Sequence, residues 1–168
     1  LYGKGYYAVY CQSPEYSYSQ FSYSFDSCID ELRKCGGFIT ILGTKYGSCY
    51  RGIKYREYAN EIVEKSLGII EQPSITLMEY YVGRKLGLPF LLLVDNTVAD
   101  HRNSPCWDLH KSLPWNEKSD LDKLASILDF INQASIDENS SVPAGNMLKF
   151  YSDIHDMRVI ISDFSLGE

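Results

Sequence analysis

Short apolar runs alternate with amphipathic stretches along the chain, and this alternation predicts strands and helices in turn. Three runs are rich in β-branched, aromatic or leucine residues and are bounded by glycine or proline, which is typical of strands: Tyr6–Tyr10, Phe38–Leu42 and Phe90–Val94. The third run is apolar at every position, as expected for a central parallel strand that helices cover on both faces. The pattern therefore predicts a sheet buried between helices.

Apolar residues at helical spacing predict helices between and after these strands. They run from an N-cap at Ser27 to Gly36-Gly37, over residues 54–67, from Ser74-Ile-Thr76 through Leu77 to Leu86, from an N-cap at Ser119 to about Ala134, and from Asp153 to Phe164. The helix over 54–67 is highly charged and is expected to be mostly solvated. Residues 95–114 are predicted to form a polar loop, and residues 135–145 a flexible connector.

Residues 16–25 alternate aromatic and polar side chains, but the alternation changes phase at Gln20. A strand would not change faces midway, so we interpret this stretch as a loop whose rings pack over the domain. An aromatic platform for the ring of a ligand is the alternative.

The order of these elements predicts an α/β fold in which helices flank a parallel sheet. Ligands of such folds bind beyond the carboxyl ends of the strands. Here those ends lead into Gly43–Ser48, the turn before Ser74, and Asp95-Asn96. Functional residues are therefore expected in these three segments.

Composition narrows the class of protein. The 168 residues suit one domain, and a hydrophobic content of 45% is inconsistent with wholesale disorder. With 16 basic and 22 acidic residues the formal charge is −6, which argues against a nucleic-acid or anionic-membrane binder. The longest clean apolar run, Phe90–Val94, is far too short to span a membrane. We expect a globular, cytoplasmic protein.

The cysteines and histidines are dispersed along the chain. The five cysteines include no C-x-x-C pair, which favours reduced thiols over a disulfide framework or a zinc site. His101 and His110 flank Cys106 and Asp108 and could suggest a metal cluster, but the segment lacks a ligand-pair spacing. No metal site is predicted.

Gly43-Thr-Lys-Tyr-Gly-Ser48 leaves a predicted strand with glycines on each side of a Lys-Tyr pair. Small residues let a phosphate or sugar approach the backbone, and Lys45 could neutralise a phosphate, although the segment matches neither common phosphate-binding loop motif. Lys45, Tyr46, Gly47 and Ser48 are therefore candidate substrate-binding residues. The alternative is a tight turn with Tyr46 tucked into the core.

Ser74-Ile-Thr-Leu-Met-Glu79 opens a predicted helix at the same edge of the sheet. Glu79 and Gly83 lie one turn apart, so that no side chain at Gly83 would shield the carboxylate from a ligand. A carboxylate in this place can stabilise or attack the anomeric carbon of a sugar as positive charge develops there. The alternative is a capping box, in which Glu79 bonds back to the amide of Thr76.

These segments follow one another in an order typical of one family. The motifs are Cys28-Ile-Asp-Glu-Leu-Arg-Lys-Cys35, Phe38-Ile-Thr-Ile-Leu-Gly-Thr-Lys-Tyr-Gly-Ser48, Ser74-Ile-Thr-Leu-Met-Glu-Tyr80 and Leu86-Gly-Leu-Pro-Phe-Leu-Leu-Leu-Val94. Over roughly residues 5–97 the chain resembles the domain-of-unknown-function family 4062 (DUF4062), whose hallmark is an Arg-Tyr-Gly-like turn followed by Ser-Ile-Thr-x-x-Glu-Tyr. It departs from the family at Lys45, where arginine is commoner, and over residues 49–73, which are long for the family.

The resemblance implies a flavodoxin-like sheet similar to those of Toll/interleukin-receptor (TIR) domains and nucleoside deoxyribosyltransferases. In the enzymes of those groups a glutamate early in the matching helix acts on the ribosyl C1′ of a nucleoside or of NAD, which makes Glu79 the implied catalytic residue. Ser74 and Thr76 would line the ribose, with Lys45 and Tyr46 facing the phosphate or base. NAD or a nucleotide would be a substrate, and no cofactor is implied.

Family members are usually N-terminal sensor or effector modules of larger signalling, NTPase or defence proteins. The implied function is thus nucleotide-related signalling or defence, with cleavage or transfer at an N-glycosidic bond. The alternative is a non-catalytic module that self-associates or docks protein partners through its sheet edge and aromatic loop.

Members of this family usually begin with a strand reading Phe-Ile/Val-Ser-Ser and a helix, both of which would precede Tyr6–Tyr10. The resemblance therefore implies a domain entered at its second strand, with the central strand of a 2-1-3-4-5 order absent. We expect an α/β domain over residues 1–115, and C-terminal helices over residues 116–168 that pack on it or extend it.

Overall fold

The computed structural model of the protein describes residues 24–134 and 147–164. Within these ranges three parallel strands form one sheet, in the order β1 (Phe38–Leu42), β2 (Phe90–Asp95) and β3 (Met147–Tyr151). Phe38 pairs with Phe90, and Leu91 pairs with Met147. The central strand β2 is buried from its first residue to Val94, as its continuous apolar pattern predicted.

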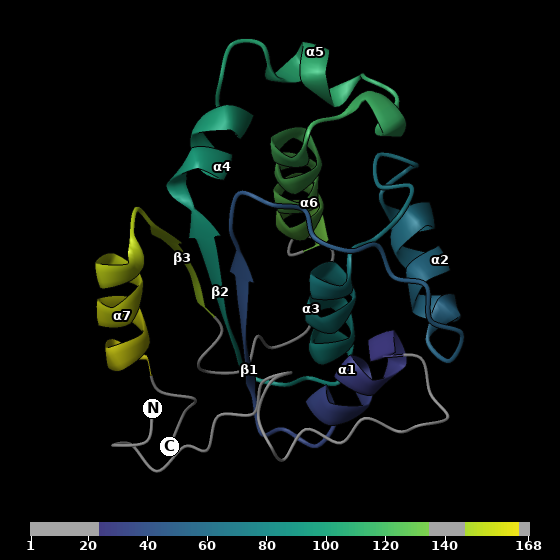
Figure 1. The fold of residues 1–168 in the computed structure, drawn as a ribbon, viewed down its shortest axis with the longest axis vertical. Helices are drawn as coiled ribbons and strands as arrows, with labels where there is room; N and C mark the ends of the chain where they lie inside the picture. Colours follow the sequence, from purple (N-terminus) through teal and green to yellow (C-terminus); the bar gives the residue numbers. More distant parts are fainter. Residues whose placement is uncertain (1–23, 135–146, 165–168) are drawn as a thin grey trace.

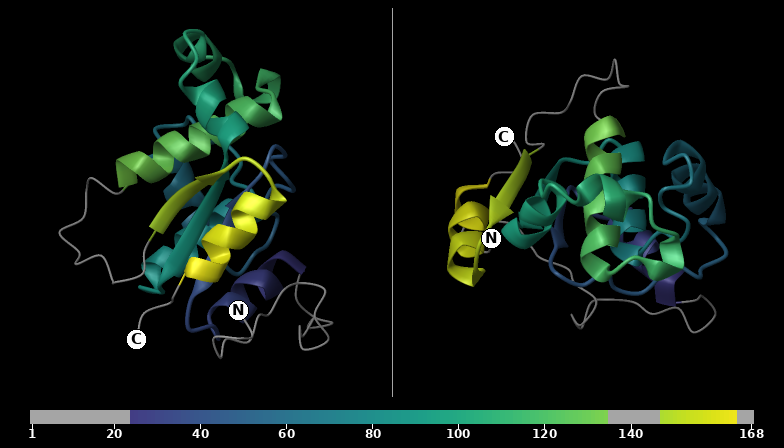
Figure 2. Two further views of the ribbon diagram at one scale, coloured as in Figure 1. Left: turned by 90° about the vertical axis from the view of Figure 1, so that its left-hand side faces the viewer. Right: turned by 90° about the horizontal axis from the view of Figure 1, so that it is seen from above.

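Helices cover both faces of this sheet (Figures 1 and 2). On one face lie α1 (Ser24–Leu32), α3 (Ile75–Lys85) and α6 (Asp120–Ala134), and on the other lies α7 (Ile154–Asp163). Successive residues of β2 point to opposite faces. Leu92 and Val94 therefore join the larger core, and Leu91 and Leu93 join the smaller core under α7.

Two peripheral parts of the fold flank the sites discussed below. The helix α2 (Arg56–Lys65) packs against α3 on the side away from the sheet. Beyond the carboxyl end of β2 the chain forms α4 (Asn96–Arg102), α5 (Trp107–Lys111) and the 3-10 turn Trp115–Glu117 (Figure 1). Both α4 and α5 contact α6.

The structure confirms the α/β class, the parallel sheet and the flanking helices. The strand at Phe38–Leu42 is observed as predicted, and the second strand extends one residue past Val94 to Asp95. The helices predicted over 54–67, 77–86, 119–134 and 153–164 form with bounds shifted by no more than two residues. The helix over 54–67 is less solvated than expected, because Ile62 is fully buried in the core.

The first described helix begins earlier than predicted. It starts at Ser24, and Ser27 is a buried residue inside it rather than its N-cap. The additional turn packs on the loop after β1, where the ring of Phe25 lies 6.4 Å from that of Tyr50 and Asp26 accepts a hydrogen bond from the Tyr50 hydroxyl. This part of α1 is therefore held by a loop that is distant in sequence.

The segment 95–114 is not the irregular loop that was predicted, because it contains α4 and α5. Asp95 acts as the N-cap of α4 by accepting a 2.8 Å hydrogen bond from the amide of Thr97, and Val98 is buried beneath that first turn. The two prolines of the segment, Pro105 and Pro114, lie between these short elements rather than inside them.

The C-terminal part was predicted as helices that pack on the domain or extend it, and besides α6 and α7 it contributes the strand β3 to the sheet. The described parts of residues 1–115 and 116–168 therefore share one sheet. The predicted strand Tyr6–Tyr10, nearly all of the aromatic stretch 16–25 and the connector 135–145 lie outside the described residues. A helix that could cross a membrane is absent from the described ranges.

Candidate functional site

The turn after β1 holds four of the candidate site residues, and they face in different directions. Tyr46 is buried, donates a 2.5 Å hydrogen bond to the carbonyl oxygen of Gln72, and packs its ring edge-on to Trp115 at 5.4 Å between centroids. Burial raises the pKa of its hydroxyl above the usual range. The tyrosine is therefore tucked into the core, as in the tight-turn alternative.

The other three residues of this turn lie at the surface. The side chain of Lys45 is 85% exposed and its ammonium lies 3.9 Å from a carboxylate oxygen of Asp120. Gly47 adopts a φ of +80°, which favours glycine and lets the chain reverse between Tyr46 and Ser48. The carbonyl oxygen of Ser48 accepts a hydrogen bond from the amide of Ile75 at 3.0 Å. The turn is thereby fastened to the start of α3.

The start of α3 is capped by Ser74, whose hydroxyl accepts a 3.2 Å hydrogen bond from the amide of Leu77. Ser74 is almost fully buried, and Thr76 lies half-buried inside the first turn of the helix. The alternative capping box between Thr76 and Glu79 is therefore wrong, because the N-cap is two residues earlier than that pairing needs.

Glu79 lies in the second turn of α3 and is half-buried. Burial raises the pKa of its carboxyl to about 7. Its carboxylate makes no side-chain hydrogen bond or ion pair to any of the residues in the described ranges. Burying an ionised carboxylate without a polar partner destabilises the folded state. Residues with pKa values shifted in this way are candidates for catalytic residues.

Helical geometry shows which side of α3 carries Glu79. Tyr81 packs its ring against that of Tyr58 in α2, at 6.4 Å between centroids. Residues two apart on a helix point in nearly opposite directions, so Glu79 faces away from α2. It shares its side with Gly83, one turn later, which packs on the first residue of β1.

The space beside Gly83 is already filled. A Cβ at this position would lie 2.4 Å from Cε1 of Phe38. Gly83 therefore allows the aromatic ring to approach the helix, which is a packing role, and its lack of a side chain does not open Glu79 to a ligand from that direction.

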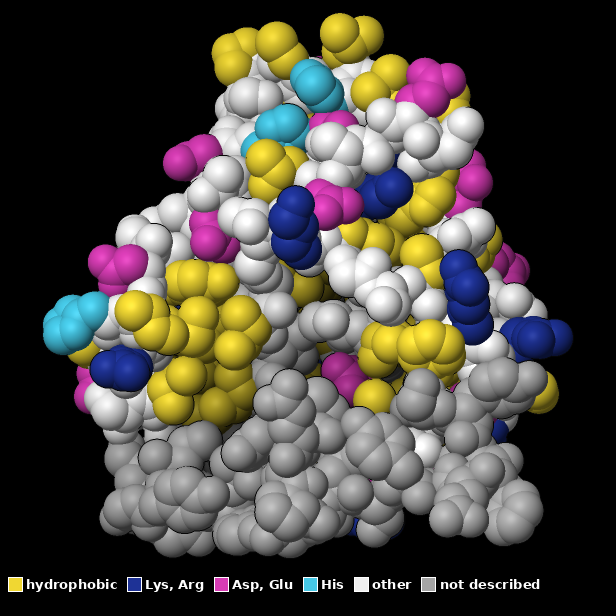
Figure 3. Space-filling view, viewed as in Figure 1, with side chains coloured by type: hydrophobic (Ala, Val, Ile, Leu, Met, Phe, Trp, Pro, Cys, Tyr) yellow, Lys and Arg dark blue, Asp and Glu magenta, His cyan; other side chains and the backbone are white. Residues whose placement is uncertain are grey.

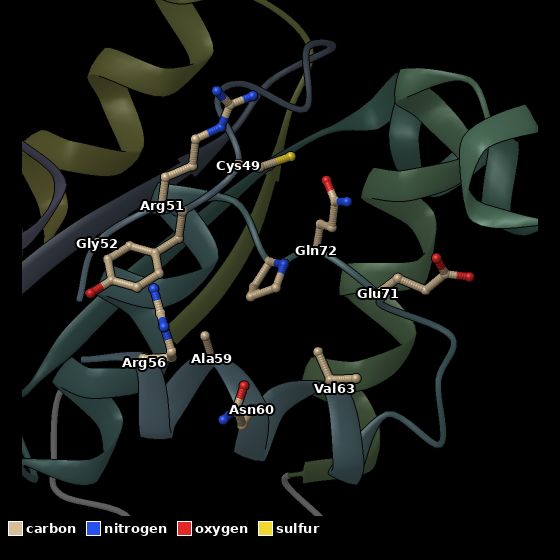
Figure 4. A pocket seen from close by; sticks show the side chains of 11 residues that line it. Cys49, Arg51, Gly52, Arg56, Ala59, Asn60, Val63, Glu71 and Gln72 are labelled. Carbon is tan, nitrogen blue, oxygen red and sulfur yellow. The ribbon is translucent and has the colours of Figure 1, made fainter. Parts of the chain in front are cut away.

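A cleft of about 400 Å³ lies beside the predicted segments, between the loop after β1, α2 and the turn before α3. Figure 4 shows the side chains that line it. They are Cys49, Tyr50, Arg51, Gly52, Arg56, Ala59, Asn60, Val63, Glu71, Gln72 and Pro73. Two arginines within a small cleft suit an anionic group such as a phosphate. Among these described lining residues there is no predicted site residue, but Cys49 and Pro73 are chain neighbours of Ser48 and Ser74.

The loop that forms one wall of this cleft is anchored to α1. The buried carboxylate of Asp26 accepts hydrogen bonds from the hydroxyl of Tyr50 and from the amides of Ile53 (3.1 Å) and Lys54 (3.3 Å). A Cβ at Gly52 would lie 2.1 Å from Asp26, so this close approach needs glycine. The role of Asp26 was not predictable from local sequence, because its partners are more than 20 residues away.

A second polar cluster lies beyond the carboxyl end of β2. His101 of α4, His110 of α5 and Asp122 of α6 bring their ligand atoms within 4.8 Å of one another. The two histidines were predicted not to form a metal site, and nothing in their spacing pointed to Asp122. The predicted N-cap at Ser119 was the available signal, since it fixes a carboxylate three residues later at the start of α6.

Three of the eight predicted site residues, Tyr46, Ser74 and Gly83, serve in packing or capping. Two others carry charged groups that could act on a ligand: the ammonium of Lys45 is exposed, and the carboxylate of Glu79 has no polar partner among the described residues. No family model, curated protein or solved structure matches the chain. A function is therefore inferred from the chemistry of these residues.

Proposed function

We propose that this chain is a nucleotide-related signalling or defence module that cleaves or transfers at the N-glycosidic bond of NAD or a nucleoside, with Glu79 as the catalytic carboxylate. The observation that carries the proposal is the half-buried carboxylate of Glu79, which has a pKa of about 7 and no polar partner among the described residues. The resemblance of Ser74–Tyr80 to the motif of family 4062 supports the same residue independently.

Cleavage of an N-glycosidic bond is favoured by a negatively charged group near the ribosyl C1′ in a poorly solvated site. When the bond between the ribosyl C1′ and the nicotinamide nitrogen of NAD breaks, the bonding pair leaves with that nitrogen and positive charge develops on the sugar ring. Ionised Glu79 stabilises this charge, and it does so more strongly where water is excluded. A water molecule then adds its oxygen to C1′ and releases a proton, which gives ADP-ribose and nicotinamide.

A single carboxylate favours NAD over an ordinary nucleoside in this proposal. Nicotinamide leaves as a neutral molecule, because the pyridinium nitrogen of NAD already carries a positive charge. The base of an ordinary nucleoside leaves as an anion and needs a proton from a second group. Glu79 cannot hold a proton for the base and a negative charge for the sugar in the same step.

The cleft between the loop after β1 and α2 does not provide the phosphate contact of this proposal. The residues that line it include two arginines, Arg51 and Arg56, and the polar residues Asn60 and Gln72, although the guanidinium group of Arg51 extends away from most of the other lining side chains (Figure 4). Because Glu79 faces away from α2, this cleft is not continuous with its carboxylate, and the phosphate contact stays with the exposed Lys45, while the hydroxyl of Tyr46 already bonds within the fold.

The test is the release of nicotinamide from NAD, measured by chromatography for the wild-type protein, Glu79→Gln and Glu64→Gln. Glu64 is an exposed residue of α2 and serves as the matched control. We expect release by the wild type and by Glu64→Gln, and a loss of at least about 100-fold in Glu79→Gln. Equal rates in all three proteins, or no release by the wild type, would overturn the assignment.

A second candidate function, self-association without catalysis, is favoured by the edge of the sheet. β3 pairs only with β2 within the described residues, and it exposes Met147 and Phe150. Figure 3 also shows hydrophobic side chains gathered over α7 and the neighbouring strands. An apolar edge strand is a surface on which a second copy can pair.

Analytical ultracentrifugation of the wild type and of Phe150→Lys tests this candidate. Dimers that dissociate in the variant would support it. A wild type that stays monomeric at high concentration would remove it.

A further inference from the structure

We infer that His101, His110 and Asp122 form a binding site for a divalent transition-metal ion of the zinc class. Their ligand atoms lie within 4.8 Å of one another although they come from three different helices, α4, α5 and α6. Figure 3 shows histidine side chains next to an acidic side chain in this upper part of the molecule. Two imidazoles and one carboxylate are a donor set that suits zinc.

The carboxylate of Asp122 is fixed with one oxygen aimed at both histidines. Its Oδ2 accepts hydrogen bonds from the amide (2.8 Å) and hydroxyl (2.7 Å) of Ser119, which caps α6. Its Oδ1 lies 2.7 Å from Nε2 of His101 and 2.9 Å from Nδ1 of His110. Only 4% of the Asp122 side chain is exposed, so the capping bonds hold it in this orientation.

Hydrogen bonds among the three side chains do not give every buried polar atom a partner. His101 forms a hydrogen bond with Oδ1, but Nδ1 of His110 is a buried atom that meets hydrogen-bond geometry with none of the described groups. A buried polar atom without a partner destabilises a fold, because it has given up its hydrogen bond to water and gained none in return. A metal ion bound by the two nitrogens and Oδ1 would give all three atoms a partner at once.

The distances are compatible with such an ion after a small adjustment. Zinc binds nitrogen and oxygen at about 2.0–2.2 Å, which places two tetrahedral ligand atoms roughly 3.3 Å apart. The observed separations of 2.7 and 2.9 Å are about half an ångström shorter. Rotation of the two imidazoles, which are 21% and 36% exposed, can supply this expansion without moving Asp122.

The helices that carry the ligands are held in place by a second carboxylate of α6. Asp129 accepts hydrogen bonds from Nε of Arg102 (2.6 Å) and from Nε1 of Trp107 (3.2 Å), and pairs with Lys111 at 3.1 Å. Arg102 follows His101 directly, and Lys111 follows His110 directly. The positions of both histidines are therefore fixed before a metal arrives, as a specific site requires.

Three protein ligands and partial exposure leave room for a fourth ligand from solvent. This is the pattern of open zinc sites, in which a bound water completes the tetrahedron. Structural zinc sites are instead closed by four protein ligands. Since Glu79 is not among these ligands, the site is separate from the proposed glycosidic chemistry.

Metal binding is tested with chelator-treated, dialysed protein titrated with Zn²⁺ by calorimetry and with Co²⁺ by absorption spectroscopy. We expect one equivalent of Zn²⁺ and a visible Co²⁺ spectrum for the wild type and for His155→Ala, which removes the exposed histidine of α7. His101→Ala and His110→Ala are expected to weaken binding at least about 10-fold each and to abolish the rise in melting temperature on adding Zn²⁺. Neither histidine caps a helix, so both variants are expected to fold.

Cys106 provides the decisive control, because its exposed thiol lies between the two histidines in the sequence and could bind Zn²⁺ by itself. Binding that survives Cys106→Ser supports the site. Binding that is lost in Cys106→Ser, that is unchanged in His101→Ala and His110→Ala, or that is absent from the wild type overturns it. Glu79→Gln should bind Zn²⁺ like the wild type, which separates failure of this site from failure of the proposed function.

Discussion

The ring of Phe38 lies directly against the backbone of Gly83, so that a Cβ on the glycine would lie 2.4 Å from Cε1 of the ring. This contact joins the start of β1 to the last full turn of α3. Phe38 also stacks on Phe90 of β2 at 5.7 Å between centroids. The ring is thus packed between α3 and β2.

Gly83→Ala is expected to destabilise the protein, although alanine is the better helix former by about 1 kcal/mol. Forcing a methyl group into a filled site costs about 1–3 kcal/mol, and here that strain exceeds the gain in helix propensity. Urea denaturation measures the difference. In the background of Phe38→Leu, which makes room, the same substitution should cost less. A Gly83→Ala variant more stable than the wild type would contradict the observed packing.

Asp26→Ala is expected to lower the free energy of unfolding by on the order of 3 kcal/mol, because the loop after β1 loses three hydrogen bonds to a buried carboxylate. Asp26→Asn keeps an accepting oxygen and should lose less. Asp163→Ala, at an exposed position of α7, is the matched control. Limited proteolysis should cut the loop of Asp26→Ala near Gly52 faster than that of the wild type. Equal stability of Asp26→Ala and the control would contradict this account.

Ionisation of Glu79 is expected to make the free energy of unfolding depend on pH. Burial raises the pKa of its carboxyl from about 4.5 in the unfolded chain to about 7 in the folded protein. The folded state thus binds the proton more tightly. Below pH 4.5 the group is protonated in both states, and as pH rises through 7 the folded protein loses up to about 3 kcal/mol of stability relative to the unfolded chain.

Urea denaturation between pH 5 and pH 8 measures this loss. Glu79→Gln cannot ionise and should show a flatter profile, with a gain in stability over the wild type that is largest at pH 8. Glu64→Gln should follow the wild type. Parallel profiles for Glu79→Gln and the wild type would show that the carboxyl is not held in a poorly solvated place.

The fold was predictable where a buried strand is apolar on both faces. Phe90–Val94 is such a strand, and the structure confirms it. The edge strand β3 was not predictable from the same pattern, because most of its side chains, including Lys149 and Phe150, are exposed and its pairing with β2 depends on a partner more than 50 residues away. The short helix α4 was not predicted, because the prolines of the segment 95–114 favoured a loop.

The candidate site was predictable only in part. The sequence placed Glu79 on a helix that packs on the sheet, and Ser74 near the start of that helix. It could not show that the hydroxyl of Tyr46 bonds to the carbonyl of Gln72, or that Phe38 fills the space at Gly83, because both contacts join distant parts of the chain. The meeting of His101 and His110 with Asp122 likewise depends on how three helices pack.

The central claim is that Glu79 is the catalytic carboxylate of N-glycosidic cleavage, and the pH profile of kcat/KM for nicotinamide release from NAD tests it most directly. Since the ionised carboxylate stabilises the charge on the sugar, kcat/KM of the wild type should rise with pH to a plateau above about 7. Glu79→Gln should lose at least about 100-fold at the plateau and show no rise near pH 7. A Glu79→Gln protein that releases nicotinamide at the wild-type rate, or a wild-type protein that releases none at any pH, would contradict the claim.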